Sequence, residues 1–302
     1  MTRRSKGSPI NGWVIVDKTA GHTSTAVVNK LKWLLNAQKA GHAGTLDPDA
    51  TGILAIALGE ATKTISYLTN ATKSYHFTVS LGSSTDTDDA SGKVLRTSDY
   101  RPKTNALREV LQMFIGNIKQ VPPSFSAVKI DGQRAYNIAR KGEQELKLKE
   151  RDLWVQELTV LERIDDDTVE MKMVCGKGGY VRSIGRDIGE KLGCFAHITK
   201  IRRISSGPFT LSDAISADII FSENIEQISN HILPIQSTLK NLNAMECSVS
   251  EAKDIKNGKA IEIYKSHLSE CLDIFITHNS TPIALGRIVK NKFHPKKVFV
   301  LA

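Results

Sequence analysis

A glycine-rich stretch, residues 40–54 (AGHAGTLDPDATGIL), constrains the chain most, because neither a helix nor a strand readily includes it. Its pair Asp47–Pro48 is typical of a turn or of the start of a helix. Its glycines, however, allow positive φ angles and a close approach of the backbone to a ligand, which helix capping does not require. The stretch is therefore either a structural turn or a loop that presents the Asp47 carboxylate, with His42 close by.

Hydrophobic patterns around this stretch predict a mixture of strands and helices. Residues 12–18 and 53–58 are apolar enough for buried strands, and residues 75–81 alternate as a half-buried strand does. Ser24 is expected to cap a helix over residues 25–35. The other predicted elements are helices over 59–70, 104–114 and 181–192, and strands over 153–162, 168–175 and 197–209. Strands and helices mix without regular βαβ alternation, but this pattern does not predict a topology.

Several kinds of site are excluded or disfavoured by spacing. The chain lacks the phosphate-loop and dinucleotide-binding signatures, and it shows no nucleophile elbow. The acidic turn 86–89 lacks the closing glutamate of an EF-hand, so a hairpin turn is expected there. His42, Asp47 and Asp49 do not have the spacing of helical metal ligands, and we expect no metal site.

The cysteines and the hydropathy of the chain indicate the cellular compartment in which the protein is expected. Its four cysteines are widely spaced without a C-x-x-C pair, so neither a zinc ribbon nor a disulfide framework is indicated, and a reduced cytoplasmic compartment fits best. No apolar run approaches the roughly 20 residues that span a bilayer. The basic start lacks the apolar stretch of a signal peptide.

The net charge of +9 and the pI near 9.3 favour a polyanionic partner, although a basic, solvated surface would give the same numbers. Residues 121–150 combine a double proline, several cations, among them Lys129 and Arg134, and two aromatic residues. Phosphates attract cations and unstacked bases pack on flat rings, so this segment suits an arm that grips RNA. A charged surface helix beside a loop is the other interpretation.

Five stretches, in order, resemble the TruB family of tRNA pseudouridine synthases. Residues 40–63 resemble the catalytic motif of that family, approximately G-H-x-G-x-L-D-P-x-A-T-G-x-L. The other four are residues 16–24 (VDKTAGHTS), 73–92 (KSYHFTVSLGSSTDTDDASG), 122–142 (PPSFSAVKIDGQRAYNIARKG) and 175–209 (from CGKGGYVRS to RRISSGPF). Together they cover most of residues 12–209. Residues from about 238 to 302 resemble the small PUA RNA-binding domain only loosely.

The resemblance assigns roles to individual residues. Asp47 matches the aspartate that attacks the target nucleoside, and His42 the histidine that disrupts the tRNA loop and holds the base out. Tyr75 matches the tyrosine that packs on the flipped base and is a candidate proton acceptor. The other matches are Arg182 as the ion-pair partner of Asp47, Tyr180 beside it, Ile201 against the base, Lys18 and Asp89 at recurrent positions, and Lys129 and Arg134 in the RNA-gripping insertion.

Three positions depart from the family pattern without removing a reacting group. Thr19 stands where proline is usual and Ser91 where an acidic residue is common. Asp49 stands where an apolar residue is frequent, and it adds a negative charge two residues from Asp47.

The resemblance also implies a fold and a function. We expect an α+β catalytic domain over residues 1–237, with a mixed, largely antiparallel central sheet, flanking helices and an insertion at about 121–150. A small β-barrel-like PUA domain is expected over 238–302. The implied activity is isomerisation of uridine 55 in the TΨC loop of tRNA by a monomer that needs no cofactor, metal or protein partner. An RNA chaperone and a guide-RNA-dependent synthase are the alternatives.

Overall fold

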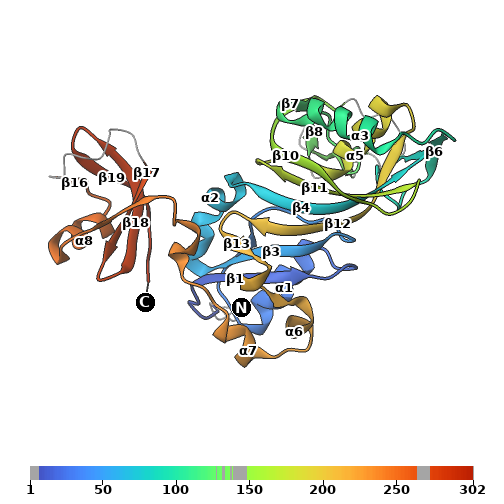
Figure 1. Ribbon diagram of the computed structural model, residues 1–302. Coiled ribbons are helices and arrows are strands. Elements are labelled where there is room, and N and C mark those ends of the chain that lie inside the picture. Colours follow the sequence, from blue (N-terminus) through green and yellow to red (C-terminus); the bar gives the residue numbers. More distant parts are fainter. Residues whose placement is uncertain are drawn as a thin grey trace. The chain divides into compact units, whose positions relative to one another are not determined.

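The computed structural model describes residues 7–126, 128–130, 133–136, 138, 148–263 and 273–301 (Figure 1). The chain divides into two compact units. The first contains Met1–Pro48, Leu54–Thr69 and Gly207–Ala302, and the second contains Asp49–Ile53 and Asn70–Ser206. None of the helices in these described ranges is long and apolar enough to cross a membrane.

The first unit begins with the strands and the helix that surround the glycine-rich loop. Its elements are β1 (Gly12–Lys18), α1 (Ser24–Leu34), β2 (Ala40–His42), most of β3 (Thr51–Leu58), the 3-10 helix η1 (Gly59–Thr64) and all but the last residue of α2 (Ile65–Asn70). Strand β2 pairs antiparallel with β3, and β1 pairs in parallel with β14 (Ile215–Ser216). Both predicted apolar strands are buried, as expected. The segment predicted as one helix over 59–70 is a 3-10 helix followed by a short α-helix.

One prediction for α1 is wrong. The N-cap of this helix is Thr23, whose hydroxyl accepts a hydrogen bond from the Ala26 N–H, whereas Ser24 is the first helical residue and is buried. Either hydroxyl suits a cap, so the sequence alone did not separate them. The Ser24 hydroxyl is instead bonded to the glycine-rich loop.

Residues 207–242 of the first unit, for which the sequence indicated no element after residue 209, contain short ones. They are β13 (Phe209–Thr210), η3 (Leu211–Asp213), β14, α6 (Ala217–Phe221), α7 (Ile225–Asn230) and η4 (Ile235–Thr238). Side-chain caps begin both α-helices, from Ser216 and Asn224. Helices of five or six residues show too little periodicity to be recognised from hydrophobic patterns.

The C-terminal region forms a curled five-stranded sheet with one helix. Its strands are β15 (Asn243–Glu246), β16 (Ile261–Glu262), β17 (Asp273–His278), β18 (Thr281–Val289) and β19 (Lys292–Val298), in the order β15-β17-β18-β19-β16. The helix α8 (Val249–Lys256) begins with a capping box between Ser248 and Glu251. This sheet fits the expected small β-barrel-like domain, whose boundary at residue 238 stays a prediction.

The second unit is built on an antiparallel sheet with helices on one face. The strand order β12-β4-β11-β10-β7 joins β12 (Ala196–Ser206), β4 (Lys73–Leu81), β11 (Thr168–Cys175), β10 (Arg151–Arg163) and β7 (Gly116–Gln120). Strand β12 also pairs in parallel with Thr51 and Gly52 at the start of β3. The expected α+β class with a mixed, largely antiparallel sheet is therefore confirmed.

Two helices cover this sheet and enclose its core. They are α3 (Thr104–Leu111), extended by η2 (Gln112–Phe114), and α5 (Val181–Leu192). The alternating residues of β4 point toward them, which confirms the predicted half-buried strand. The apolar residues of the core on these three elements are Tyr75, Phe77, Val79, Leu81, Leu107, Leu111, Phe114, Val181, Ile184 and Ile188.

Helix α5 approaches β12 closely because two glycines, Gly185 and Gly189, lie on the face of the helix next to that strand. A Cβ atom on Gly189 would lie 2.3 Å from the backbone nitrogen of Ala196, and one on Gly185 would lie 2.4 Å from the Ile198 side chain. Such separations are far inside van der Waals contact, so a larger residue at either position would displace the helix. Since α5 begins at Val181, this close contact also determines the distance between the first turn of the helix and the sheet.

Candidate active site

The loop that contains Asp47 is anchored immediately before the aspartate. The buried Ser24 hydroxyl accepts a hydrogen bond from the Leu46 N–H and donates one to the Leu46 carbonyl, both at 2.9 Å. Leu46 itself is 4% exposed. One side chain of α1 therefore satisfies both backbone groups of the residue that precedes the aspartate.

A buried lysine anchors the loop immediately after the aspartate. Lys18, at the end of β1, has no exposed surface, and its ammonium donates to the Pro48 carbonyl at 2.8 Å. The same ammonium donates to the carbonyls of Thr19 at 2.8 Å and His22 at 2.9 Å. The Gly21 N–H donates a further bond to Pro48 at 3.0 Å. Hydrogen bonds from a charged donor are stronger than neutral ones, so Lys18 is a firm tie between two loops.

Asp47 is thus a half-buried carboxylate held between two fixed neighbours. His42 ends β2, where it is the register partner of Ile56, and it is also half-buried. The extra acid Asp49 is exposed. This arrangement favours presentation of the carboxylate over simple helix capping, because no helix begins at Asp47.

Two glycines of the loop have the unusual backbone angles that the sequence indicated. Gly44 and Gly52 both have φ of +96°. At Gly52 a Cβ atom would also lie 2.2 Å from the carbonyl oxygen of Arg203 on β12. The backbone that Gly52 approaches is therefore a neighbouring strand, and the glycine is required to pair β3 with β12.

In the second unit, Tyr75 and Ile201 lie on adjacent strands. Tyr75, 9% exposed, is the register partner of Arg203 on β12 and of Met173 on β11. Ile201 pairs with Phe77 and packs against the core as a partly buried residue. The fully buried Arg203 donates from Nε to the Ile53 carbonyl at 2.6 Å, which ties β12 to the segment that follows the loop.

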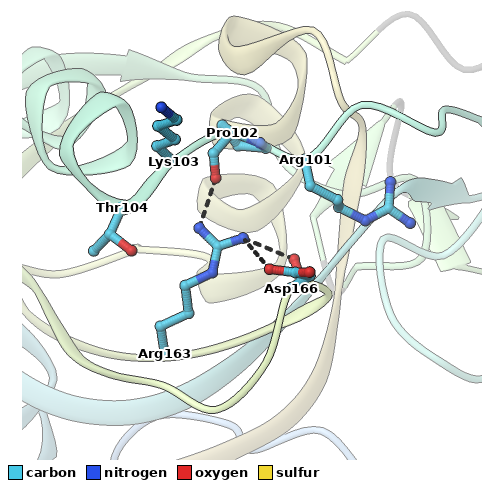
Figure 2. A pocket seen from close by; sticks show the side chains of 6 residues that line it. All are labelled: Arg101, Pro102, Lys103, Thr104, Arg163 and Asp166. Atoms are coloured by element: carbon cyan, nitrogen blue, oxygen red, sulfur yellow. Dashed lines mark hydrogen bonds and ion pairs between the residues drawn. The ribbon is translucent and has the colours of Figure 1, made fainter.

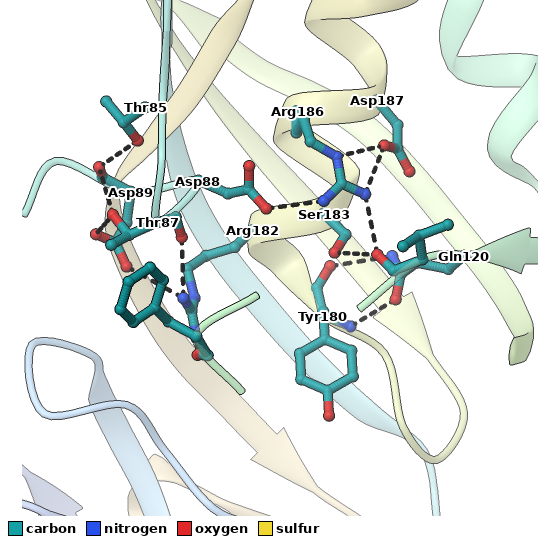
Figure 3. A network of polar contacts seen from close by, with 12 residues as sticks. Thr85, Thr87, Asp88, Asp89, Gln120, Tyr180, Arg182, Ser183, Arg186 and Asp187 are labelled. Carbon is teal, nitrogen blue, oxygen red and sulfur yellow. Dashed lines mark hydrogen bonds and ion pairs between the residues drawn. The ribbon is translucent and has the colours of Figure 1, made fainter. Parts of the chain in front are cut away.

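Arg182 lies in the first turn of α5 and is 5% exposed (Figure 3). Its guanidinium donates to the carbonyls of Thr87 and Phe125, each at 3.0 Å, and lies 3.4 Å from the carboxylate of Asp89. Asp89 is therefore an ionic partner of Arg182 within its unit. Asp47 belongs to the other unit, and the ion pair that the sequence predicts between Asp47 and Arg182 stays a prediction.

Asp89 also organises the hairpin turn between β5 (Ser83–Thr85) and β6 (Val94–Thr97), which confirms the turn expected there. Its carboxylate accepts bonds from the Thr87 hydroxyl at 2.6 Å and from the hydroxyl and N–H of Ser91 at 2.6 and 3.0 Å. Ser91, one of the departures from the family pattern, thus has a defined role as a donor in this turn.

Tyr180 is the N-cap residue of α5, and Gln120 holds it by a pair of bonds. The Tyr180 N–H donates to the Gln120 side chain at 2.9 Å, and the Gln120 amide donates to the Tyr180 carbonyl at 3.1 Å. In Figure 3 the phenol ring of Tyr180 points away from Arg186 and Asp187. The buried glutamine therefore fixes the backbone of Tyr180 at the start of α5.

A second arginine of α5 was not predicted as a site residue. Arg186 donates to the Asp88 carboxylate at 2.8 Å and to the Val121 carbonyl at 2.9 Å. Burial raises the pKa of Asp88 to about 6, while Arg186 and then Arg182 oppose the shift. The sequence feature that could have indicated Arg186 is its spacing of four residues from Arg182 on a predicted helix, which places both side chains on one face.

Lys129 and Arg134 are register partners in the short hairpin of β8 (Lys129–Ile130) and β9 (Gln133–Arg134). Their side chains, and much of the predicted insertion over 121–150, lie outside the described residues. Among the residues that are described, no group of three or more His, Cys, Asp or Glu side chains could hold a metal ion.

A pocket at the start of α3 contains none of the predicted site residues (Figure 2). The guanidinium of Arg163 in this pocket donates to the Pro102 carbonyl at 2.6 Å and to the Asp166 carbonyl at 2.9 Å. The residues that line it are Arg101, Pro102, Lys103, Thr104, Arg163 and Asp166. Because its central cation already binds the surrounding backbone, we do not assign it to the active site.

Solved structures define the class of the fold. The chain is similar over 96% of its length to a chain in "Crystal Structure of a Cbf5-Nop10-Gar1 Complex", of which 85% is covered, with 27% identity and a TM-score of 0.72. A chain in "Structure of H/ACA RNP bound to a substrate RNA containing 2'-deoxyuridine" has the same TM-score of 0.72 at 24% identity, with 100% and 92% of the two chains covered. The fold is that of the pseudouridine synthases.

Sequence comparisons define the family. The model of the TruB family pseudouridylate synthase N-terminal domain matches residues 32–181, and that of the tRNA pseudouridylate synthase B C-terminal domain matches residues 182–240. Relatives named tRNA pseudouridine synthase B are 49% identical over 300 residues in Ruegeria pomeroyi and 50% identical over 298 residues in Paracoccus denitrificans, each covering 99% of both chains. The chain therefore belongs to the TruB family of pseudouridine synthases, as its motifs indicated.

Proposed function

We propose that this chain isomerises uridine 55 in the TΨC loop of tRNA to pseudouridine, with Asp47 as the nucleophile. The name shared by the relatives, tRNA pseudouridine synthase B, supports the substrate class. The observation that carries the assignment of Asp47 is the double anchoring of its loop, by Ser24 at Leu46 and by Lys18 at Pro48. A reacting group gains most when its neighbours hold it before the substrate arrives.

The proposed reaction requires few chemical groups beyond these residues. Uracil is detached from C1′, turned, and rejoined through C5, so that no atom is gained and no electron leaves. The reaction therefore requires neither a cofactor nor a metal ion. In our proposal the Asp47 carboxylate attacks the target nucleoside, and Arg182 keeps that carboxylate charged in a site from which water is excluded.

The base must leave its stack before Asp47 can act on the nucleoside. We assign His42 to opening the loop, and Tyr75, Tyr180 and Ile201 to the surface on which the flipped uracil packs. After uracil detaches, a proton leaves the sugar, and Tyr75 is the acceptor that we propose. The sugar regains a proton when C5 bonds to C1′. C5 then loses its hydrogen and N1 gains a proton, so the product is an isomer of uridine. The positions of Tyr75 and Ile201 on adjacent strands support a shared surface, because neighbouring strands lie about 4.8 Å apart.

Binding of tRNA is assigned to basic segments outside the loop. We propose that the insertion over 121–150, including Lys129 and Arg134, grips the RNA, and that the C-terminal β domain contributes to binding. The net charge of +9 supports a polyanionic substrate. We further propose that the protein works in the cytoplasm as a monomer without a protein partner.

The test is tritium release from a bare tRNA transcript labelled at C5 of uridine, incubated with the purified protein alone. We expect tritium release from the wild-type transcript. A transcript with cytidine in place of uridine 55 should release no tritium. Release only after a guide RNA or protein is added would contradict the stand-alone function. Binding and refolding of tRNA without any release would favour an RNA chaperone instead.

A further inference from the structure

Two arginines of α5, one helical turn apart, join the same two segments to that helix (Figure 3). The first segment is the turn 85–91, and the second is residues 120–125, which include the first residues of the predicted RNA-gripping insertion over 121–150. Arg182 binds the turn through the Thr87 carbonyl and the Asp89 carboxylate, and it binds the second segment through the Phe125 carbonyl.

Arg186 repeats this arrangement at a second point. Its Nη1 contacts the Asp88 carboxylate in the turn at 2.8 Å, and its Nη2 donates to the Val121 carbonyl in the second segment at 2.9 Å. Asp187 accepts from Nε of the same guanidinium at 2.9 Å. The Ser183 hydroxyl adds a bond to the Val121 carbonyl at 2.8 Å, so that this carbonyl is fixed by two donors from α5.

The Asp88 position is itself tightly constrained. Asp88 is 8% exposed and has φ of +60°, an angle that non-glycine residues rarely adopt. Its carbonyl accepts a bond from the Ile198 N–H at 3.1 Å, and the Ala90 N–H donates to the Ile198 carbonyl at 2.9 Å. Strand β12 and Arg186 therefore hold the turn from two directions.

These contacts have a geometric consequence for Arg182. Each amino group of its guanidinium bonds to a different segment, so its orientation depends on where both segments lie relative to α5. Strand β12 also holds the turn, and Ser183 also holds Val121. Arg186, one helical turn from Arg182, differs from these contacts because it bonds both segments at once. We propose that Arg186, paired with Asp88, is a positioning residue that fixes the guanidinium of Arg182 for the isomerisation, an inference that rests on the function proposed above.

The chain offers a matched control on the same helix. Arg96 on β6 makes a pair of the same kind with Glu190 of α5 at 2.8 Å, but the two side chains are 51% and 46% exposed. Besides Glu190, Arg96 bonds to the Ser84 hydroxyl on β5 at 3.4 Å and lies over the Phe195 ring, and in the described part of the chain these contacts lie outside the turn 85–91 and segment 120–125. Arg96→Met therefore removes an arginine–carboxylate contact of α5 without changing the surroundings of Arg182.

The experiment measures single-turnover tritium release with enzyme in saturating excess over labelled tRNA, together with the tRNA dissociation constant. Because misplacement by about 1 Å can cost a factor of about 100, we expect Arg186→Met to slow release at least about tenfold with a dissociation constant within about twofold of wild type. Asp88→Asn keeps an oxygen acceptor for Arg186 and is expected to lose less, about threefold. Arg96→Met should change neither quantity.

A double-mutant cycle shows whether Arg186 acts through Arg182. In an Arg182→Lys background, Arg186→Met should slow release by less than about twofold, because the group that it positions is already altered. An equal loss in both backgrounds, or a wild-type rate for Arg186→Met, would overturn the proposal. If Arg186→Met does not fold, the same cycle with Asp88→Asn decides: additive losses overturn the proposal and non-additive losses support it.

Failure of the proposed function has a separate signature. If the wild-type protein binds tRNA but releases no tritium, the isomerisation is contradicted and positioning is read from NMR instead. The ¹⁵N-labelled guanidinium signal of Arg182 should then shift in Arg186→Met and stay in place in Arg96→Met. An unshifted Arg182 signal in Arg186→Met would overturn the positioning role.

Discussion

Ser24→Ala tests whether the anchoring of the loop matters for function as well as for stability. The substitution leaves both the N–H and the carbonyl of the buried Leu46 without their partner at 2.9 Å. Each intramolecular bond contributes about 1 kcal/mol net, and a buried backbone group left without a partner costs about 1–3 kcal/mol. We therefore expect the free energy of unfolding to fall by about 2–4 kcal/mol.

The same change should slow isomerisation, because Asp47 follows Leu46 directly. A shift of the carboxylate by about 1 Å would lower the single-turnover rate by about 10- to 100-fold. Urea unfolding gives the stability, and tritium release at saturating enzyme and at a temperature well below unfolding gives the rate. Neither measurement depends on the other, so the two effects can be separated.

Thr23→Ala is the matched control. It removes the N-cap of the same helix and should cost about 1 kcal/mol of stability, but Thr23 makes its side-chain bond to Ala26 and not to the loop. Its rate should equal that of wild type. If Ser24→Ala also kept the wild-type rate while losing stability, the loop would not depend on this anchor and the reasoning would be refuted.

Three further changes test the packing and the electrostatics of the second unit. Gly52→Ala places a methyl group 2.2 Å from the Arg203 carbonyl at a φ of +96°, so urea unfolding should show a loss of at least about 2 kcal/mol, and a loss below about 0.5 kcal/mol would contradict the close approach. Gly189→Ala, with its methyl 2.3 Å from the Ala196 nitrogen, should cost about 1–3 kcal/mol by the same measurement. Burial raises the pKa of Asp88 from 3.8 to about 6, so the folded state binds this proton more tightly than the unfolded chain. The free energy of unfolding should therefore fall by up to about 3 kcal/mol as pH rises through this window, and it should stay level above it. Urea unfolding from pH 4 to 7 should show that this fall is missing in Asp88→Asn, and an unchanged slope would count against the shift.

Local patterns predicted most elements of the catalytic region. Strand β4 and helix α5 were both predicted, because alternation and helical spacing report directly on which face is buried. Motif resemblance supplied the fold class, which periodicity alone did not. The short helices α6 and α7 were missed, since each is too short to show a period.

The contacts that hold the site were much harder to predict. Ser24 was expected to cap a helix, and its partner Leu46 lies 22 residues further along the chain. Arg186 contacts Asp88 and Val121, which are 98 and 65 residues away. Such contacts depend on how strands and helices pack in three dimensions, and short-range patterns in a single sequence do not predict that packing.

Lys18 is a further residue whose structural role could not be predicted from the sequence. Resemblance marked it as a recurrent position without a definite role, and a lysine is rarely buried completely. The three carbonyls that receive its ammonium, from Thr19, His22 and Pro48, explain the burial and give the residue a role in shaping the loop.

The central claim is that Asp47 is the nucleophile for isomerisation of uridine 55. The direct test compares tritium release from C5-labelled tRNA by wild type and by Asp47→Asn, a substitution of nearly equal volume that removes only the charge. We expect no release above background from Asp47→Asn, with tRNA binding within about twofold of wild type, because the loop anchors at Leu46 and Pro48 are untouched. Release at the wild-type rate from Asp47→Asn would contradict the account.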